Sequence, residues 1–207
     1  MMKRGIIVDR DGTLIDFYRD GSLGVVTPAF HPSHVRLLPG VISGLHALRD
    51  AGYVFAIATN QPDAAKGGLP REAIERTNQR LVEVLAAEGI EVATLRACLH
   101  HPEGGPGGDP SLIRTCDCRK PKPGLLERII EELDLDRAAS WMIGDTAADL
   151  GAAHGAGVRM AMVMQIERCE LCQLVGVPLG GLEEPALRAP TLDELATAIL
   201  KDAGSAP

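Results

Sequence analysis

Three short apolar runs in the chain each stop abruptly at polar residues that can carry chemistry. They are Gly5–Val8, Val54–Thr59 and Trp141–Gly144. An apolar run of this length, bounded by turn residues, is typical of a strand that is buried on both faces. The first run stops at Asp-Arg-Asp-Gly-Thr, the second at Asn-Gln-Pro and the third at Asp-Thr. The pattern therefore predicts buried strands that carry polar clusters at their ends.

Helical segments separate these runs. Apolar residues at helical spacing predict helices at Val41–Asp50, Pro70–Glu88, Leu125–Leu133, Asp149–Gly155 and Leu192–Lys201. Val158–Val163 is a further expected strand. The alternation predicts an α/β fold, with a Rossmann-like parallel sheet covered by helices on both faces. In such sheets ligands bind beyond the carboxyl ends of the strands, which is where Asp9, Thr59 and Asp145 fall.

Length and composition predict one globular domain spanning residues 1–207. Of the 207 residues 45% are apolar and 24% are charged, and no inserted segment is long enough to form a large cap domain. The net charge of −7 argues against non-specific nucleic-acid binding, which needs a basic surface. No apolar segment long enough for a signal peptide or membrane span follows Met1–Arg4. We therefore expect a cytoplasmic protein without membrane contact, and a monomer by default.

Two segments, Asp16–His34 and His101–Thr115, have no periodic pattern. In the second, seven of fifteen residues are Gly or Pro, and little apolar material is present beyond Leu112 and Ile113. Both segments are expected to be loops, and long loops in a compact domain are often functional. His31 and His34 could line a substrate entrance in the first loop, although solvated loop residues are the ordinary alternative.

Asp9 and Asp11 place two carboxylates two residues apart at the end of the first expected strand. A carboxylate can attack phosphorus and form an acyl phosphate, which divides hydrolysis into two steps. A second carboxylate can protonate the leaving oxygen and later take a proton from water. For an isolated pair the ordinary explanation is a simple Asp-x-Asp-Gly turn. The buried strand before the pair, and the polar residues at the other strand ends, favour catalysis.

The ordered set of motifs resembles the haloacid dehalogenase (HAD) superfamily of phosphatases. The four matching motifs are Asp9–Thr13, Thr59, Lys120 and the Gly-Asp-x-x-x-Asp of Gly144, Asp145 and Asp149. The motifs occur in the order and with the spacing of that superfamily and cover roughly Gly5 to Val163. Thr59 or Lys120 alone would carry no information, but the combination is highly specific.

The resemblance implies a magnesium ion and defined roles for the site residues. Phosphate brought to a site that holds Asp9 and Asp145 would be repelled, and Mg²⁺ is the oxygen-seeking cation that can offset the repulsion. In the superfamily the metal is held by positions equivalent to the Asp9 side chain, the Asp11 carbonyl and Asp145. Lys120 would neutralise phosphoryl oxygens and Thr59 would donate a hydrogen bond to them. Asp149 is either an outer partner of the metal or a helix-start carboxylate near the positive end of the dipole.

A set of metal ligands flanks the second irregular segment. The ligands are Cys98, His100, Cys116 and Cys118. Three thiolates and an imidazole suit tetrahedral Zn²⁺, and because the protein fills all four positions a structural zinc in the loop 98–118 is expected. His101 is an alternative to His100, and scattered cytosolic thiols are the ordinary alternative to a zinc site. Because Arg119 and Lys120 follow directly, the metal would fix the segment that presents Lys120.

The zinc loop narrows the resemblance to the D-glycero-D-manno-heptose 1,7-bisphosphate 7-phosphatases and the related histidinol-phosphate phosphatases. This resemblance implies that Asn60, Gln61 and Arg119 contact the substrate. The chain departs from the usual pattern of that group at three positions near the substrate. They are Pro62 and Asp63, where Ser-Gly is usual, and Thr146, where Lys is usual.

The expected function is Mg²⁺-dependent hydrolysis of a small sugar phosphate through an aspartyl-phosphate, with the 7-phosphate of the heptose bisphosphate as the first candidate. Histidinol phosphate or another sugar phosphate is the alternative substrate. A non-catalytic, zinc-stabilised binding protein is the alternative from a different class, and the intact Asp9, Asp11, Lys120 and Asp145 argue against it. Cys169 and Cys172 have the spacing of half a zinc site, but no second pair follows residue 118, so free thiols are expected.

Overall fold

A six-stranded parallel sheet forms the centre of the protein. The computed structural model describes residues 2–164 and 184–204. The strands are β1 (Gly5–Val8), β4 (Val54–Asn60), β5 (Val92–Cys98), β6 (Trp141–Gly144), β7 (Arg159–Val163) and β8 (Leu187–Ala189). They lie in the order β5-β4-β1-β6-β7-β8, and every neighbouring pair is parallel. The strands that carry Asp9, Thr59 and Asp145 are therefore adjacent at the middle of the sheet.

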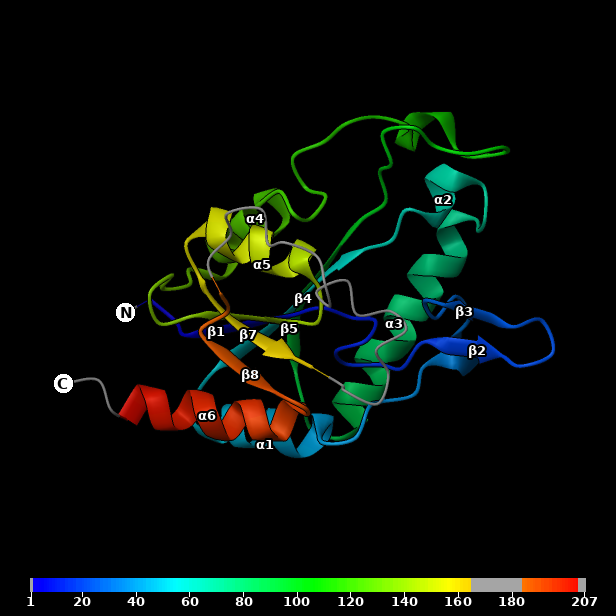
Figure 1. Ribbon diagram of the computed structural model, residues 1–207. Helices are drawn as coiled ribbons and strands as arrows, with labels where there is room; N and C mark the ends of the chain where they lie inside the picture. The colour runs from blue at the N-terminus through cyan, green and yellow to red at the C-terminus, as the bar shows by residue number, and fades with distance from the viewer. Residues whose placement is uncertain (1, 165–183, 205–207) are drawn as a thin grey trace.

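Helices cover both faces of the sheet, as the sequence predicts (Figure 1). The helices are α1 (Val41–Asp50), α2 (Asp63–Lys66), α3 (Arg71–Ala87), α4 (Gly124–Leu133), α5 (Ala147–Ala156) and α6 (Leu192–Gly204). Buried residues of α1, α3 and α6 pack on one face, and those of α4 and α5 pack on the other. The predicted α/β fold with a covered parallel sheet is confirmed, and no cap-sized insertion interrupts the described residues.

The strand β1 explains why both faces are filled. Successive side chains of a strand point to opposite faces, so Ile6 and Val8 enter the core beneath α1, whereas Ile7 enters the core beneath α4. All three are essentially inaccessible to water. A strand buried on both faces has to be apolar throughout, and the short run before Asp9 therefore ends where the sheet meets solvent.

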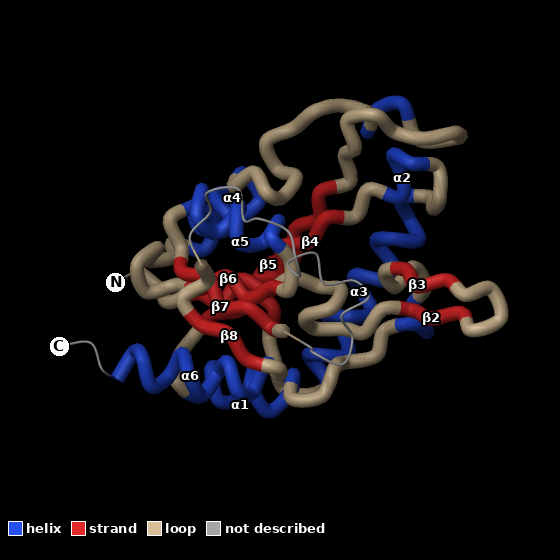
Figure 2. Tube along the Cα trace, viewed as in Figure 1, coloured by secondary structure: helices blue, strands red, loops and turns tan. Residues whose placement is uncertain are grey.

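The segment Asp16–His34 contains a β-hairpin, so the expectation of an unstructured loop is wrong for part of it. Strands β2 (Tyr18–Asp20) and β3 (Val25–Thr27) pair antiparallel and project from the body of the protein (Figure 2). A 3₁₀ turn, η1 (Pro32–His34), follows, and its His34 ring stacks on Tyr18 with centroids 3.9 Å apart. Strands of three residues are too short to produce a recognisable alternation in the sequence.

The second irregular segment, His101–Thr115, is a loop with one 3₁₀ turn, η2 (Pro110–Leu112). Its packing is stronger than its composition suggests. Leu112 is buried in a small apolar cluster with Ala65 of α2 and Ile74 of α3, and the amide of Asp109 donates to the carbonyl of Ala64 at 2.9 Å. The loop is therefore docked on α2 as well as held at its two ends.

Two strands of the sheet escaped prediction, and both lie at its edges. These are β5 and β8. β5 has a mixed pattern of exposure and β8 has only three residues, so neither has the continuous apolar run of the central strands. Among the described helices none is long and apolar enough to cross a membrane. Cys169 and Cys172 lie outside the described residues.

Candidate active site

Three carboxylates meet at the carboxyl ends of the central strands. Asp9 follows β1, Asp145 follows β6, and Asp149 lies in the first turn of α5. Carboxylate oxygens of the three lie within 4.8 Å of one another. The cause is topological, because β1 and β6 are neighbours in the sheet and both strands end at the same edge. Like charges this close repel strongly away from bulk water.

Asp9 is held through one of its two oxygens. Its Oδ1 accepts a hydrogen bond from the amide of Arg10 at 2.7 Å and pairs with the Lys120 ammonium at 2.9 Å. No described residue donates to Oδ2. Burial raises the pKa of Asp9 to about 6, Lys120 opposes that rise, and the charge of Asp149 adds to it. Asp9 is therefore an oriented carboxylate with one oxygen available for chemistry.

Lys120 is a buried cation fixed by three oxygens. Its Nζ donates to Asp149 Oδ1 at 2.6 Å and to the carbonyl of Ala58 at 2.8 Å, and it pairs with Asp9. The side chain is 2% exposed. Burial lowers the pKa of Lys120, but the carboxylates of Asp149 and Asp9 outweigh burial and raise it above its ordinary value. A cation therefore stands at the edge of the carboxylate cluster.

Asp149 is the helix-start carboxylate that was one of the two alternatives, and it also contacts Lys120. Its Oδ2 accepts from the backbone amide of Thr146 at 3.1 Å and from the Thr146 hydroxyl at 2.6 Å, which forms a capping box at the start of α5. Its Oδ1 accepts from Lys120. The helix cap thus orients a fully buried carboxylate toward Lys120, and Thr146, which departs from the usual family residue, provides that cap.

The cluster carries more negative charge than the protein neutralises, and this excess fits a divalent cation. Burial together with the Asp149 and Asp9 carboxylates raises the pKa of Asp145 well above its ordinary value. Gly12, at φ +80°, lies against this carboxylate, and a Cβ there would meet Asp145 Oδ2 at 2.2 Å. The donors are all oxygens, which Mg²⁺ prefers. The residues therefore fit the ion that the family resemblance implies.

Asp11 is not one of the three clustered carboxylates and has its own set of hydrogen-bond donors. Its oxygens accept hydrogen bonds from the guanidinium of Arg10, the amide nitrogen of Gln61 and the backbone amide of Ala29. Asp11 is 8% exposed and Arg10 is completely buried. The second aspartate of the pair is therefore held by a separate network of donors, which keeps it close to Asp9 in the chain but distinct in its contacts.

Residues at the end of β4 form hydrogen bonds with other residues of the site. The side chain of Asn60 accepts from the backbone amide of Lys120 at 3.1 Å and donates to its carbonyl at 3.0 Å. The amide nitrogen of Gln61 donates to the Thr59 hydroxyl at 2.9 Å and to Asp11 at 2.7 Å. Asn60 and Gln61 therefore use their side chains within the protein, and contact with a substrate stays a prediction for both.

Arg119 differs from Asn60 and Gln61 because part of its guanidinium is unused. Its Nη1 is buried and has no hydrogen-bond partner among the described residues. A buried donor without a partner costs stability unless a ligand or water satisfies it. Among the residues predicted to contact the substrate, Arg119 thus has a buried nitrogen that could donate to a phosphate or hydroxyl oxygen.

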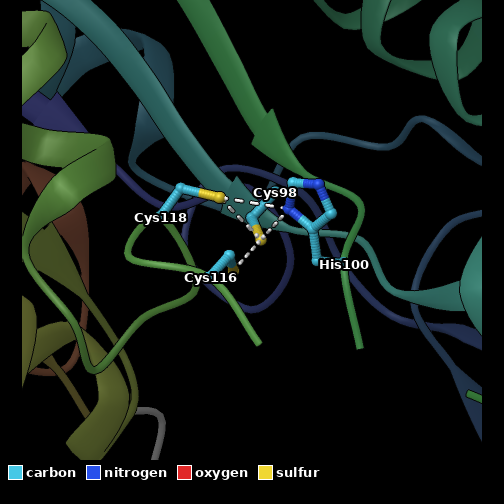
Figure 3. Close-up of side chains that lie close together, drawn as sticks. All are labelled: Cys98, His100, Cys116 and Cys118. Atoms are coloured by element: carbon cyan, nitrogen blue, oxygen red, sulfur yellow. Dashed lines mark hydrogen bonds between the residues drawn. The ribbon is translucent and has the colours of Figure 1, made fainter. Parts of the chain in front are cut away.

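The four predicted zinc ligands form a second cluster beside the site (Figure 3). Cys98 Sγ lies 3.7 Å from Cys116 Sγ and 3.2 Å from Cys118 Sγ, and His100 Nδ1 lies 3.3 Å from Cys118 Sγ. Ligands at about 2.0–2.3 Å from a tetrahedral zinc are roughly 3.5–3.8 Å apart. Burial raises the pKa of the Cys98 and Cys118 thiols, so a cation is needed to keep them as thiolates.

The neighbouring histidine, His101, has another use. Its Nδ1 accepts hydrogen bonds from the amides of Glu103 and Gly104 at 3.3 and 3.1 Å. Its backbone pairs with the other side of the loop, because the amide of His101 donates to Leu112 and its carbonyl accepts from Arg114. The structure therefore brings His100 to the cysteines and uses His101 to close the base of the loop.

Comparisons with known proteins agree with this geometry. The family described as HAD-hydrolase-like matches residues 117–165. The D-glycero-beta-D-manno-heptose-1,7-bisphosphate 7-phosphatase of Pasteurella multocida is 33% identical over 165 residues, which are 79% of this chain and 83% of that enzyme. The Vibrio cholerae enzyme of the same name is 36% identical over 141 residues, 68% of this chain and 74% of its own length.

A solved structure gives the same result. The D,D-heptose 1,7-bisphosphate phosphatase from B. bronchiseptica, crystallised with magnesium and phosphate, has a TM-score of 0.72 at 29% identity, covering 96% of this chain and 99% of that one. The chain belongs to the heptose bisphosphate phosphatase family of HAD-like hydrolases. It is a phosphatase, and the alternative of a non-catalytic binding protein is thereby set aside.

Sequence reasoning missed the deepest polar residues of this heptose bisphosphatase-like site. Arg10 is the variable residue between two catalytic aspartates, and only its position inside the motif gave a signal. Asn78 lies on the buried face of α3 and bonds the Arg10 guanidinium at 2.6 Å. Nothing in the sequence distinguishes Asn78 from the other polar residues of that helix, because its partner lies 68 positions away.

The buried Lys120–Asp149 pair predicts a stability effect. Asp149→Ala leaves Lys120 buried with one carboxylate in place of two, and we expect a loss of roughly 3 kcal/mol in the free energy of unfolding, measured by urea titration. Asp50→Ala is the matched control, because Asp50 pairs with Arg49 at the surface and has a side chain 67% exposed. The control should lose less than about 1 kcal/mol. Equal losses would show that Asp149 does not stabilise the buried cation.

Proposed function

We propose that the protein removes the 7-phosphate of D-glycero-D-manno-heptose 1,7-bisphosphate through an aspartyl-phosphate on Asp9. The observation that carries the proposal is the geometry of Asp9, whose Oδ1 is held by Arg10 and Lys120 while no residue in the described part of the chain donates to Oδ2. A carboxylate oriented in this way has a defined attacking atom. The names of its relatives support the choice of substrate.

In the first step Asp9 Oδ2 attacks phosphorus, and the bond from phosphorus to the sugar oxygen breaks. Asp11 donates a proton to that oxygen, so the sugar leaves as a neutral alcohol. In the second step Asp11 takes a proton from water, whose oxygen attacks the phosphorus of the aspartyl-phosphate and releases inorganic phosphate. Lys120 and the Thr59 hydroxyl stabilise the charge on the phosphoryl oxygens in both steps.

Asp9, the backbone carbonyl of Asp11 and Asp145 are the residues that would hold Mg²⁺. When bound, the ion supplies positive charge that offsets the carboxylates and polarises the phosphoryl group. The excess of carboxylates over cations in the cluster supports this assignment. Asp149 is already used by Lys120 and Thr146, and we therefore assign it to positioning the lysine.

Arg119 is proposed to bind the substrate at a distance from the reacting phosphorus. A guanidinium matches phosphate with two parallel hydrogen bonds, and a bisphosphate keeps a second phosphate after the first has entered the site. The unused Nη1 of Arg119 supports this role. Asn60 and Gln61 are proposed to complete the substrate site from the end of β4.

The cluster of Cys98, His100, Cys116 and Cys118 is proposed to hold a structural Zn²⁺. All four positions would be filled by protein, so the metal would have no open site for a substrate. The three cysteines form no disulfide with one another, and the cytoplasmic location stays a prediction. The monomeric state and the single domain over residues 1–207 stay predictions.

A phosphate-release assay tests the function. Purified protein with Mg²⁺ is given both anomers of heptose 1,7-bisphosphate, histidinol phosphate, hexose phosphates and p-nitrophenyl phosphate. The expected result is the highest kcat/KM for a heptose bisphosphate and background turnover for Asp9→Asn, which keeps the side-chain size but loses the nucleophile. Preference for histidinol phosphate would overturn the substrate, and an active, verified Asp9→Asn protein would overturn the mechanism.

The raised pKa of Asp9 predicts competition between protons and Mg²⁺. Below about pH 6 Asp9 becomes protonated, and the proton has to leave before the metal binds. The apparent Mg²⁺ affinity should therefore fall by about tenfold for each pH unit below that value, measured by calorimetry. Protonation of Asp145, whose pKa is also raised, would steepen the fall. An affinity that stays constant from pH 7 to pH 5 would contradict the assignment of Asp9 as a ligand.

The zinc proposal predicts a local catalytic effect. Elemental analysis of the wild type should give about one zinc per chain. Cys118→Ser should lose zinc and shift Lys120, and a shift on the order of 1 Å costs roughly 10²-fold in turnover. The sheet should still unfold cooperatively, because the core beneath α1 and α6 contains none of these cysteines, although Cys98 and Cys118 belong to the core beneath α4. Cys172→Ser, at a predicted free thiol, is the control and should keep its zinc.

Two outcomes would contradict this prediction. Loss of zinc with unchanged turnover would mean that the metal does not position Lys120. Absence of zinc from wild-type protein purified without strong chelators would contradict the proposal of a structural zinc. Zinc content, thermal unfolding and turnover should be measured on the same preparation.

A further inference from the structure

Arg10 forms a two-point contact with the carboxylate of Asp11. Its Nε donates to Asp11 Oδ2 at 2.9 Å and its Nη2 donates to Asp11 Oδ1 at 3.2 Å. A guanidinium is a rigid planar fork, so a paired contact of this kind fixes the plane of the carboxylate as well as its position. Arg10 is 0% exposed, and water therefore has no part in this contact.

The guanidinium is itself held by three other segments of the chain. Nη1 donates to Oδ1 of Asn78 in α3 at 2.6 Å, and Nη2 donates to the carbonyl of Ala29 at 2.8 Å and to Oε1 of Gln61 at 2.9 Å. Asn78 comes from a helix, Gln61 from the end of β4 and Ala29 from the segment after the β2–β3 hairpin. Arg10 thus connects Asp11 to the rigid body of the fold.

Asp11 receives two further donors that complete its coordination. The backbone amide of Ala29 donates to Oδ1 at 3.0 Å, and Nε2 of Gln61 donates to Oδ2 at 2.7 Å. Each oxygen therefore accepts two hydrogen bonds. A carboxylate with both oxygens fixed in this way cannot rotate freely, although the backbone around Asp11 alone would allow rotation.

We propose that Arg10 is a positioning residue that sets the angle at which Asp11 exchanges a proton with the leaving oxygen, with Asn78 as the support of the guanidinium. The proton takes the place of the 3.2 Å bond from Nη2 to Asp11 Oδ1, because Nη2 has two hydrogens and keeps Ala29 and Gln61 as acceptors. The inference rests on the proposed role of Asp11 as the general acid and base. A role in stability alone would need only a buried positive charge. The planar fork, supported from behind by Asn78, instead controls orientation, which a lysine at the same position would not reproduce.

The consequence lies in how the rate depends on the leaving group. The value of kcat/KM reports the steps up to departure of the leaving group, and proton donation matters most when that group is a poor one. Loss of the Asp11 orientation should therefore lower kcat/KM for substrates whose leaving oxygen is basic. Substrates whose leaving group is acidic should be affected much less. A general loss of folded protein would slow all substrates equally.

The experiment uses the full chain with Mg²⁺ and a series of aryl phosphates from p-nitrophenyl to phenyl phosphate. For Arg10→Lys we expect kcat/KM to fall by about 10²-fold for phenyl phosphate and by only a few-fold for p-nitrophenyl phosphate, which steepens the dependence on leaving-group pKa. Arg96→Lys is the matched control, because Arg96 pairs with Glu132 in a half-exposed contact. It should keep the wild-type dependence.

Asn78→Ala and Asp11→Asn complete the test. Asn78→Ala leaves Arg10 and Asp11 intact and removes the support at Nη1, so it should steepen the dependence by a smaller amount, and it carries the test if Arg10→Lys does not fold. Asp11→Asn should give the steepest dependence. If kcat/KM depends steeply on leaving-group pKa in Asp11→Asn but has the wild-type slope in folded Arg10→Lys and Asn78→Ala, the positioning role of Arg10 is overturned and the role of Asp11 stands. A wild-type slope in Asp11→Asn would overturn the proposed function of Asp11.

Discussion

Repulsion among carboxylates at one edge of the sheet is the constraint around which the site is built. Asp9, Asp145 and Asp149 are brought within 4.8 Å because β1 and β6 are adjacent and parallel and α5 starts where β6 ends. Lys120, buried among them, offsets part of this charge. The remaining negative charge is the reason for proposing a cation and its phosphate ligand at this cluster. A fold that separated these strands would remove both the repulsion among the carboxylates and the proposed cation site.

The position of Lys120 depends on two structures that meet at the end of β5. The segment that carries Lys120 follows Cys118 directly, and its backbone is bound on both sides by the Asn60 side chain. Asn60 pairs in turn with Cys98 across β4 and β5, and the amide of Gln61 donates to the Cys98 carbonyl at 2.8 Å. The thiol cluster and the motif at the end of β4 are therefore connected by a few short hydrogen bonds, and this connection is why we predict that a change at the cysteines shifts Lys120.

The central sheet and the polar residues that meet at its edge could be predicted from the sequence, and the reason is physical. Strands buried on both faces must be apolar throughout, and the residues that end them must be polar. The sequence pattern therefore identifies β1, β4 and β6 and the polar residues at their ends. Edge strands such as β5, and short ones such as β2 and β3, obey no such rule. The network of Arg10, Asn78 and Gln61 was also out of reach, since its members are separated by up to 68 positions and meet only when α3 packs.

The two aspartates of the first motif, Asp9 and Asp11, differ in their surroundings. Asp9 is oriented by a backbone amide and a cation, which suits a nucleophile that has to keep one oxygen free. Asp11 is surrounded by donors on both oxygens, which suits a group whose direction matters more than its exposure. Two carboxylates two residues apart thus acquire different properties. Asp9 pairs with Lys120 at the carboxylate cluster, whereas Asp11 pairs with the buried guanidinium of Arg10. Environment, rather than residue type, is therefore the basis on which we propose Asp9 as the nucleophile and Asp11 as the proton carrier.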